Sequence, residues 1–193
     1  MMRRALVAAM ALVAATLGLA ATPWAWATAS AATSATTATA SNSPPLVIVG
    51  APGLAWSDLE RDDLPALTAL VEQGASGSLT VRAVRSRSCA IDGWLTLSAG
   101  RRAGDLPGPC REPLPPVGGL VPYWSDYLAA AAADSYDARP GLLAEAVAAS
   151  GACLQSSGAG AAIGAADPDG SVGSTYSDTV PTSVECPVVL VDA

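Results

Sequence analysis

Residues 46–50 read Leu46-Val-Ile-Val-Gly50, and they follow directly on Pro44-Pro45. A short, wholly apolar run with β-branched side chains is typical of a strand buried in a parallel sheet. A second run of this type occupies residues 187–191, and helical patterns lie between the two. This order predicts an α/β domain with a mostly parallel sheet flanked by helices.

The first predicted helix spans residues 63–73. Asp62 or Asp63 is expected to cap it, because a carboxylate at the cap accepts hydrogen bonds from the first free N–H groups. Pro65 suits the first turn, where no helix hydrogen bond is lost. Gly74 is expected to end the helix.

The next segment, 78–84, alternates apolar and polar side chains and predicts a strand. A strand, a helix and a strand in succession predict a right-handed crossover. The remaining chain is expected to be irregular over 104–122, helix or loop over 123–136, helical over 140–150, small and apolar with glycine breaks over 153–165, and a tight turn at Asp167-Pro-Asp-Gly170.

Residues 1–27 have the composition of a secretory signal peptide. A basic start with Arg3 and Arg4 precedes an apolar run, and Ala25-Trp26-Ala27 offers the small-x-small pattern of a cleavage site. The alternative is an uncleaved membrane anchor, but the Ala-rich run has a borderline length for spanning. Residues 28–43 consist almost entirely of Ala, Ser and Thr and predict a flexible tether. The α/β domain then covers 44–193, and we expect it to be secreted or to lie at the extracytoplasmic face of the cell envelope.

The chain is acidic, with 17 acidic residues against 10 arginines and with no lysine or histidine. Its formal net charge of −7 becomes −9 when Arg3 and Arg4 leave with the signal peptide. Such a surface repels nucleic acid and anionic lipid headgroups, so we expect no nucleic-acid partner. Membrane contact is expected only through an uncleaved N-terminal segment or through transmembrane helices of a longer form.

Four cysteines, an even number in an exported chain, favour disulfides over metal thiolates. No pair has C-x-x-C spacing and the chain lacks histidine, so we expect neither a zinc site nor another cofactor. Three pairings are possible. We favour Cys89–Cys110 and Cys153–Cys186, since each closes a loop around a local unit. Each such bond stabilises a fold by about 3–4 kcal/mol through chain entropy.

Several segments, taken in order, resemble one large superfamily. After the first strand come Gly53 and Trp56-Ser-Asp-Leu59, followed by the helix that leads into Glu72-Gln-Gly74. The run Arg87-Ser-Cys-Ala-Ile-Asp-Gly-Trp-Leu-Thr-Leu-Ser-Ala-Gly100 stands further on. This order resembles the N-terminal half of the alkaline-phosphatase-like superfamily, and is most similar to exported actinobacterial proteins of that type. Residues 143–151 and 153–165 resemble the helix and strand that follow the nucleophile segment in the superfamily.

The resemblance implies an incomplete sheet and a site that lacks its chemistry. Active members place a metal-binding Asp after the first strand, where this chain has Pro52. The nucleophile position falls on Ser88 or Cys89, and Ser88 is the better candidate if Cys89 is in a disulfide. The other metal ligands, Asp and His, come from a C-terminal half that lies beyond the resemblance. Asp92 is near in sequence, but one carboxylate does not make a two-metal site.

Two functional hypotheses follow. The first is a non-catalytic exported domain of degenerate alkaline-phosphatase-like type, with a binding or structural role at the cell envelope. The second is a metal-dependent phosphate or sulfate ester hydrolase with Ser88 as its nucleophile. Without a metal or a base, a serine hydroxyl keeps the pKa of an ordinary alcohol, which favours the first hypothesis. Because the chain has no Phe, we expect its aromatic residues to pack in the core, among them Trp94, Tyr123, Trp124 and Tyr127.

Overall fold

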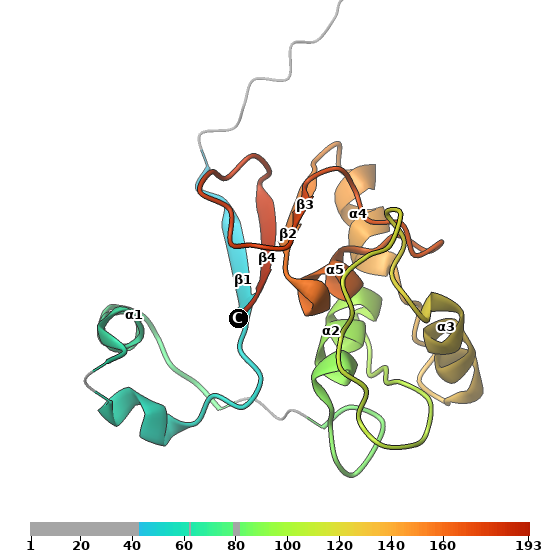
Figure 1. The fold of residues 1–193 in the computed structure, drawn as a ribbon, viewed down its shortest axis with the longest axis horizontal. Coiled ribbons are helices and arrows are strands. Elements are labelled where there is room, and N and C mark those ends of the chain that lie inside the picture. Colours follow the sequence, from blue (N-terminus) through green and yellow to red (C-terminus); the bar gives the residue numbers. More distant parts are fainter. Residues whose placement is uncertain (1–42, 62, 79–81) are drawn as a thin grey trace, which may run out of the picture. The chain divides into compact units, whose positions relative to one another are not determined.

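The computed structural model describes residues 43–61, 63–78 and 82–193. The predicted signal peptide and all of the predicted tether except residue 43 lie outside these ranges. In the described ranges no helix is long and apolar enough to cross a membrane. The elements are β1 (Leu46–Gly50), η1 (Trp56–Glu60), α1 (Pro65–Gln73), α2 (Ala90–Ala99), α3 (Trp124–Ala133), α4 (Leu142–Ala149), β2 (Leu154–Ser157), α5 (Ala159–Ala165), β3 (Tyr176–Ser177) and β4 (Val188–Asp192) (Figure 1).

The described strands form one sheet in the order β1-β4-β2-β3, and every neighbouring pair is parallel. The α/β class and the parallel sheet are therefore as the sequence predicts. The two apolar runs from the ends of the domain lie side by side, with Leu46 opposite Val188 and Gly50 opposite Asp192. Their carboxyl ends meet at one edge of the sheet, which is where parallel folds form ligand sites.

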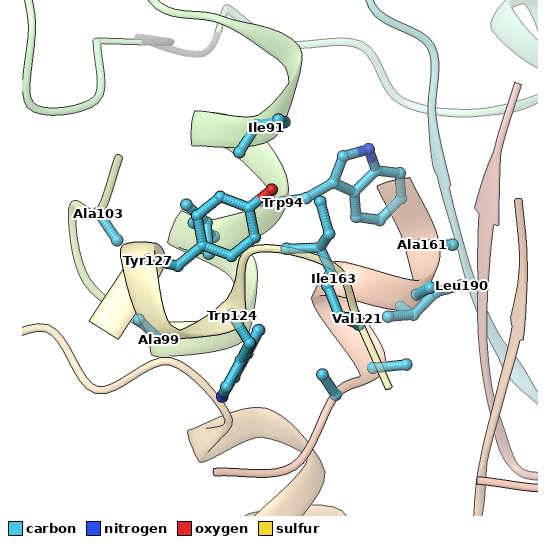
Figure 2. Packing of buried hydrophobic residues seen from close by; sticks show 14 residues of the cluster. Ile91, Trp94, Ala99, Ala103, Val121, Trp124, Tyr127, Ala161, Ile163 and Leu190 are labelled. Carbon is cyan, nitrogen blue, oxygen red and sulfur yellow. The ribbon is translucent and has the colours of Figure 1, made fainter. Parts of the chain in front are cut away.

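The core lies between helices α2, α3 and α5 and the central strand β4. Ile91 and Leu95 on α2 and Ile163 on α5 are fully buried, as is Leu190 on β4 (Figure 2). Five of the six buried residues of α2 are spaced i, i+3, i+4, i+7 and i+8, the pattern of one helix face: Ile91, Trp94, Leu95, Ser98 and Ala99. The sixth is Asp92 in the first turn. This helical spacing is visible in the sequence of residues 90–99.

Strand β1 lies at the edge of the described sheet. Leu46 donates its N–H to the Pro187 carbonyl of the segment before β4, and the Gly50 carbonyl accepts the N–H of Ala193. Because alternate residues of a parallel strand point their backbone groups to the same side, those of Val47 and Val49 face the other, open edge. Both valine side chains are also exposed. A strand predicted to be buried is thus buried only in part.

Helix α1 forms where the sequence predicts it, but its cap differs. Leu64 occupies the N-cap position, and no side chain caps the helix. Asp63 instead accepts two hydrogen bonds from the guanidinium of Arg61, at 2.9 and 2.7 Å. The prediction that Asp63 caps the helix is therefore wrong, because a nearer charged partner holds its carboxylate. Asp62, the other candidate, lies outside the described residues.

Two further predictions need correction. Residues 78 and 82–84 are not in a strand, while 79–81 lie outside the described residues. In the segment 153–165 a strand covers only 154–157, after which Gly158 turns the chain into α5. Gly158 has φ +88°, and a Cβ there would lie 2.9 Å from Cβ of Asp192. Only glycine fits this turn, so the strand ends there.

The two disulfides join Cys89 to Cys110 and Cys153 to Cys186, and no cysteine in the described residues is free. These are the pairings favoured from the sequence. The first ties the N-terminus of α2 to the irregular segment 104–122. The second ties the residue before β2 to the chain just before β4, so it fastens two neighbouring strands at their starts.

Candidate functional site

A pocket of about 710 Å³ lies at the carboxyl end of β1. One wall comes from Ile48 and the turn 50–54, and another from the first turns of α2, including Trp94 and Leu97. Residues 82 and 83 complete the lining. A pocket beyond the carboxyl end of a parallel strand, beside a helix N-terminus, is where α/β folds bind ligands.

The indole of Trp94 on α2 lines the pocket, and three glycines make room for it. A Cβ on Gly50 of β1 would lie 2.5 Å from the ring, one on Gly160 of α5 would lie 2.1 Å away, and one on Gly164 would lie 3.0 Å away. The indole N–H donates to the Asp192 carboxylate at 3.2 Å, which also accepts the Gly160 N–H at 2.7 Å. Trp94 is thus held rigidly by close contacts on several sides.

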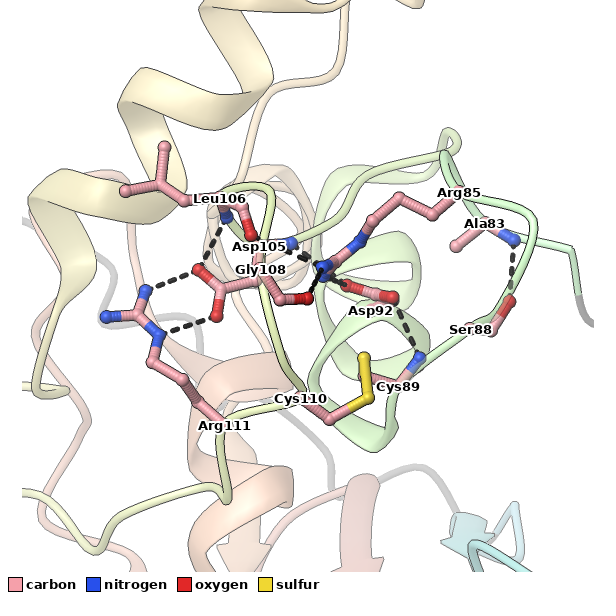
Figure 3. Close-up of a disulfide and its surroundings, with 10 residues drawn as sticks. All are labelled: Ala83, Arg85, Ser88, Cys89, Asp92, Asp105, Leu106, Gly108, Cys110 and Arg111. Carbon is pink, nitrogen blue, oxygen red and sulfur yellow. Dashed lines mark hydrogen bonds and ion pairs between the residues drawn. A yellow bond between two sulfur atoms is a disulfide. The ribbon is translucent and has the colours of Figure 1, made fainter.

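Ser88, the candidate nucleophile, lines this pocket together with Cys89 and Pro52. These are the positions that the superfamily resemblance assigns to the site, and the fold brings them together although 36 residues separate Pro52 from Ser88. The Ser88 hydroxyl accepts the N–H of Ala83 at 3.1 Å (Figure 3). Cys89 is in a disulfide and offers no thiol.

Asp92, the carboxylate nearest to Ser88 in sequence, is fully buried and fully engaged. It accepts the N–H groups of Cys89 at 2.8 Å and of Asp105 at 2.9 Å (Figure 3). The Arg85 guanidinium donates to it at 3.0 Å and also reaches the carbonyls of Leu106 and Gly108. Asp92 therefore caps α2 and anchors the irregular segment, and its lone pairs are committed to these structural bonds.

A second ionic cluster lies beside the first. Arg111 binds the carboxylates of Asp105 and Asp126 and stacks on the rings of Tyr123 and Tyr127. Burial raises the pKa of Asp105, but the hydrogen bonds from Arg111 and from the Leu106 N–H outweigh it and hold that pKa below its usual value. Burial, with the nearby Asp105 charge, raises the pKa of Tyr127 to about 12.

Three of the four aromatic residues assigned to the core are buried, namely Trp94, Trp124 and Tyr127. Tyr123 is instead half exposed, and it has a left-handed backbone with φ +61°. Its ring lies under the guanidinium of Arg111, whose carbon is 4.4 Å from the ring centroid. The prediction of a core role is wrong for Tyr123, because a cation–π contact at the surface holds the ring.

No metal centre can be assembled from the described residues, where no group of three or more His, Cys, Asp or Glu side chains is suitably placed. Pro52 has no side-chain oxygen, although it lies on the pocket wall. The turn at 167–170 is a plain turn, in which the Asp167 carboxylate accepts the N–H groups of Asp169 and Ser171. Its Oδ1 atom thus accepts two hydrogen bonds within the turn.

Nothing in the sequence indicated a site role for Arg82, which among the described residues is the one charged side chain on the pocket wall. The role of Gly160 and Gly164, which are spaced i, i+4 on α5 and admit Trp94, was also missed. That spacing of small residues was visible in the sequence, but nothing in the sequence indicated which large side chain would pack there.

Comparison with protein-family models, with curated proteins and with solved structures finds no match to this chain.

Proposed function

We propose that this protein is an exported domain that binds a ligand at the cell envelope through the pocket beside α2, without catalysing a reaction. In this proposal it descends from the alkaline-phosphatase-like fold and retains the place of the site but not its chemistry. The two disulfides fit an oxidising compartment outside the cytoplasm. N-terminal sequencing of the secreted protein should find a start near residue 28, and an intact Met1 would contradict export.

The proposal rests mainly on the burial and hydrogen bonding of Asp92, which leave it unable to act as a base. A general base must be within reach of the nucleophile and able to accept its proton. Asp92 is fully buried, and its oxygens accept bonds from Cys89, Asp105 and Arg85. The pocket that Ser88 faces is walled largely by apolar side chains such as Ile48, Trp94 and Leu97. This combination suits retention of a ligand better than activation of a hydroxyl.

The second candidate, an ester hydrolase, is favoured by one observation. Ser88 stands just before α2 and lines the pocket, so a bound ester would lie beside its hydroxyl. Hydrolysis would still need a metal or a base to activate the hydroxyl and to neutralise charge on the transferred group.

An activity assay separates the two candidates. The mature domain is incubated with aryl phosphate, phosphodiester and sulfate substrates, each with zinc, magnesium, manganese or calcium. We expect no turnover above the metal-only rate. Metal-dependent turnover that disappears in Ser88→Ala, but persists in the neighbouring variant Ser86→Ala, would replace the binding proposal with the hydrolase.

A further inference from the structure

The pocket carries a positive side chain, although the protein as a whole has a net negative charge. The protein is acidic, and most arginines of the described residues have a partner: Arg61, Arg85, Arg101, Arg111 and Arg139 pair with carboxylates, and Arg102 lies over the ring of Tyr136. In the same ranges, neither Arg82 nor Arg87 has an ion pair or a side-chain hydrogen bond, although carboxylates outnumber arginines.

Of these two arginines, only Arg82 lines the pocket. In the part of the chain that the structure describes, no carboxylate lines it, since Asp92 and Asp192 are turned to other partners. At the N-terminus of α2, the Asp92 carboxylate accepts the N–H of Cys89 and places a negative charge in the first turn, which offsets the helix dipole there. Arg82 is therefore the group that gives the pocket its positive charge, and it would favour an anionic group in the ligand.

The rest of the wall is apolar and of suitable size. Ile48 and Leu97 line it together with the rigid indole of Trp94, and Leu54 is half exposed in the turn after β1. A volume of about 710 Å³ lies within the range of roughly 300–1,000 Å³ found for sites of small organic ligands. Such a wall gains most from a ligand that buries an apolar chain.

We infer that the pocket binds a single-chain amphiphile with an anionic head, such as a fatty acyl carboxylate, with the head at Arg82 and the chain against Trp94 and Leu97. This inference rests on the proposed binding function and names its ligand class. Charge selects the head group, while apolar burial supplies the affinity that any chain of the same length would share.

The test uses isothermal titration calorimetry of the mature domain with three probes that share one chain: decanoate, decan-1-ol and decyltrimethylammonium. Inorganic phosphate is a fourth probe. We expect decanoate to bind most tightly, decanol more weakly and the cation most weakly. Arg82→Gln should weaken decanoate binding about tenfold, the effect of losing one charged hydrogen bond, and leave decanol unchanged. Arg87→Gln is the matched control, because it removes the other unpaired arginine and should change neither.

A second variant tests where the ligand lies. Gly93 is on the pocket wall, and a Cβ added there meets no atom within 4 Å. Gly93→Leu should therefore fill the pocket without disturbing the fold, and it should abolish binding of decanoate and decanol alike. Its thermal unfolding, measured in parallel, shows that the variant is folded.

The outcomes separate the two claims. If decanol binds as tightly as decanoate and Arg82→Gln changes nothing, the anion inference is overturned while the binding function stands. If no probe with a chain binds, the inference of an amphiphile fails. If Gly93→Leu leaves binding intact, the ligand lies outside the pocket, and both the inference and the proposed function fail. Binding of phosphate without decanoate would overturn the inference in favour of the hydrolase candidate.

Discussion

Two regions of this domain differ in how much of their apolar side-chain surface is buried. In the first, 46–73, Leu46 and Val49 are each 58% exposed, and no residue of α1 is buried. In the second, helices α2 and α5 pack on β4 around Trp94, and Leu95 is 0% exposed. Both regions have good apolar patterns. The difference shows that a pattern specifies an element, while burial requires a partner of matching shape.

The second region has such partners because its glycines allow close approach. Gly160 and Gly164 let α5 come near α2 with the indole of Trp94 between them. In the first region, Leu70 extends from α1 with 68% of its surface exposed. Leu46, Val47 and Val49 on β1 are likewise exposed, so neither element of this region buries its apolar side chains.

The largest expected effect is on buried charge. Asp92→Ala should lower the free energy of unfolding by about 3–5 kcal/mol, because it leaves Arg85 partly buried without its carboxylate and uncaps α2. Asp63→Ala, which removes the exposed pair with Arg61, should cause no measurable loss. Urea denaturation monitored by tryptophan fluorescence measures both. Equal losses would show that the two regions do not differ in their electrostatic support.

The next effect compares one substitution in the two regions. Leu95→Ala should cost about 2–5 kcal/mol, since it opens a cavity in the core. Leu70→Ala should change stability by no more than about 0.5 kcal/mol, as is usual for exposed sites. Chemical denaturation of both variants measures the difference. A large loss in Leu70→Ala would mean that α1 is buried in solution.

The smallest expected effect is on the pH dependence of stability below about pH 4. Because Arg111 lowers the pKa of Asp105 in the folded state, its carboxylate contributes stability above the unfolded pKa of about 3.9, and this contribution is lost as the pH falls through the folded pKa. Asp105→Asn should therefore flatten the loss of stability below about pH 4.

The matched control for this prediction is Asp63→Asn. The Asp63 pKa is also lowered, by its hydrogen bonds with Arg61, but the pair is exposed and screened by solvent. The free energy of unfolding of Asp63→Asn should therefore fall at low pH in the same way as that of the wild type. Stability measured by urea denaturation between pH 2 and 6 compares the three proteins, and parallel acid limbs for all three would contradict the assigned role of Arg111.

Much of the fold could be predicted because it depends on local patterns. The runs 46–50 and 187–191 were recognisable as strands from their β-branched side chains, and α1 and α4 from apolar spacing and glycine stops. The cysteine pairing was one of three possibilities, favoured because each bond closes a loop around a local unit, and the structure has these bonds. Parallel pairing of the first and last strands was less accessible, since the sequence contains no local signal for which strands become neighbours.

For the site, the sequence by itself determined the residue types: a serine before a helix, a proline after the first strand, and no histidine. Only the tertiary structure decided that Pro52, Ser88 and Arg82 line one pocket, and that Asp92 is committed to Arg85 and two backbone N–H groups. The physical reason is distance along the chain. Local sequence patterns reflect interactions between residues that are a few positions apart. Hydrogen bonds and packing between distant segments form only when the whole domain folds.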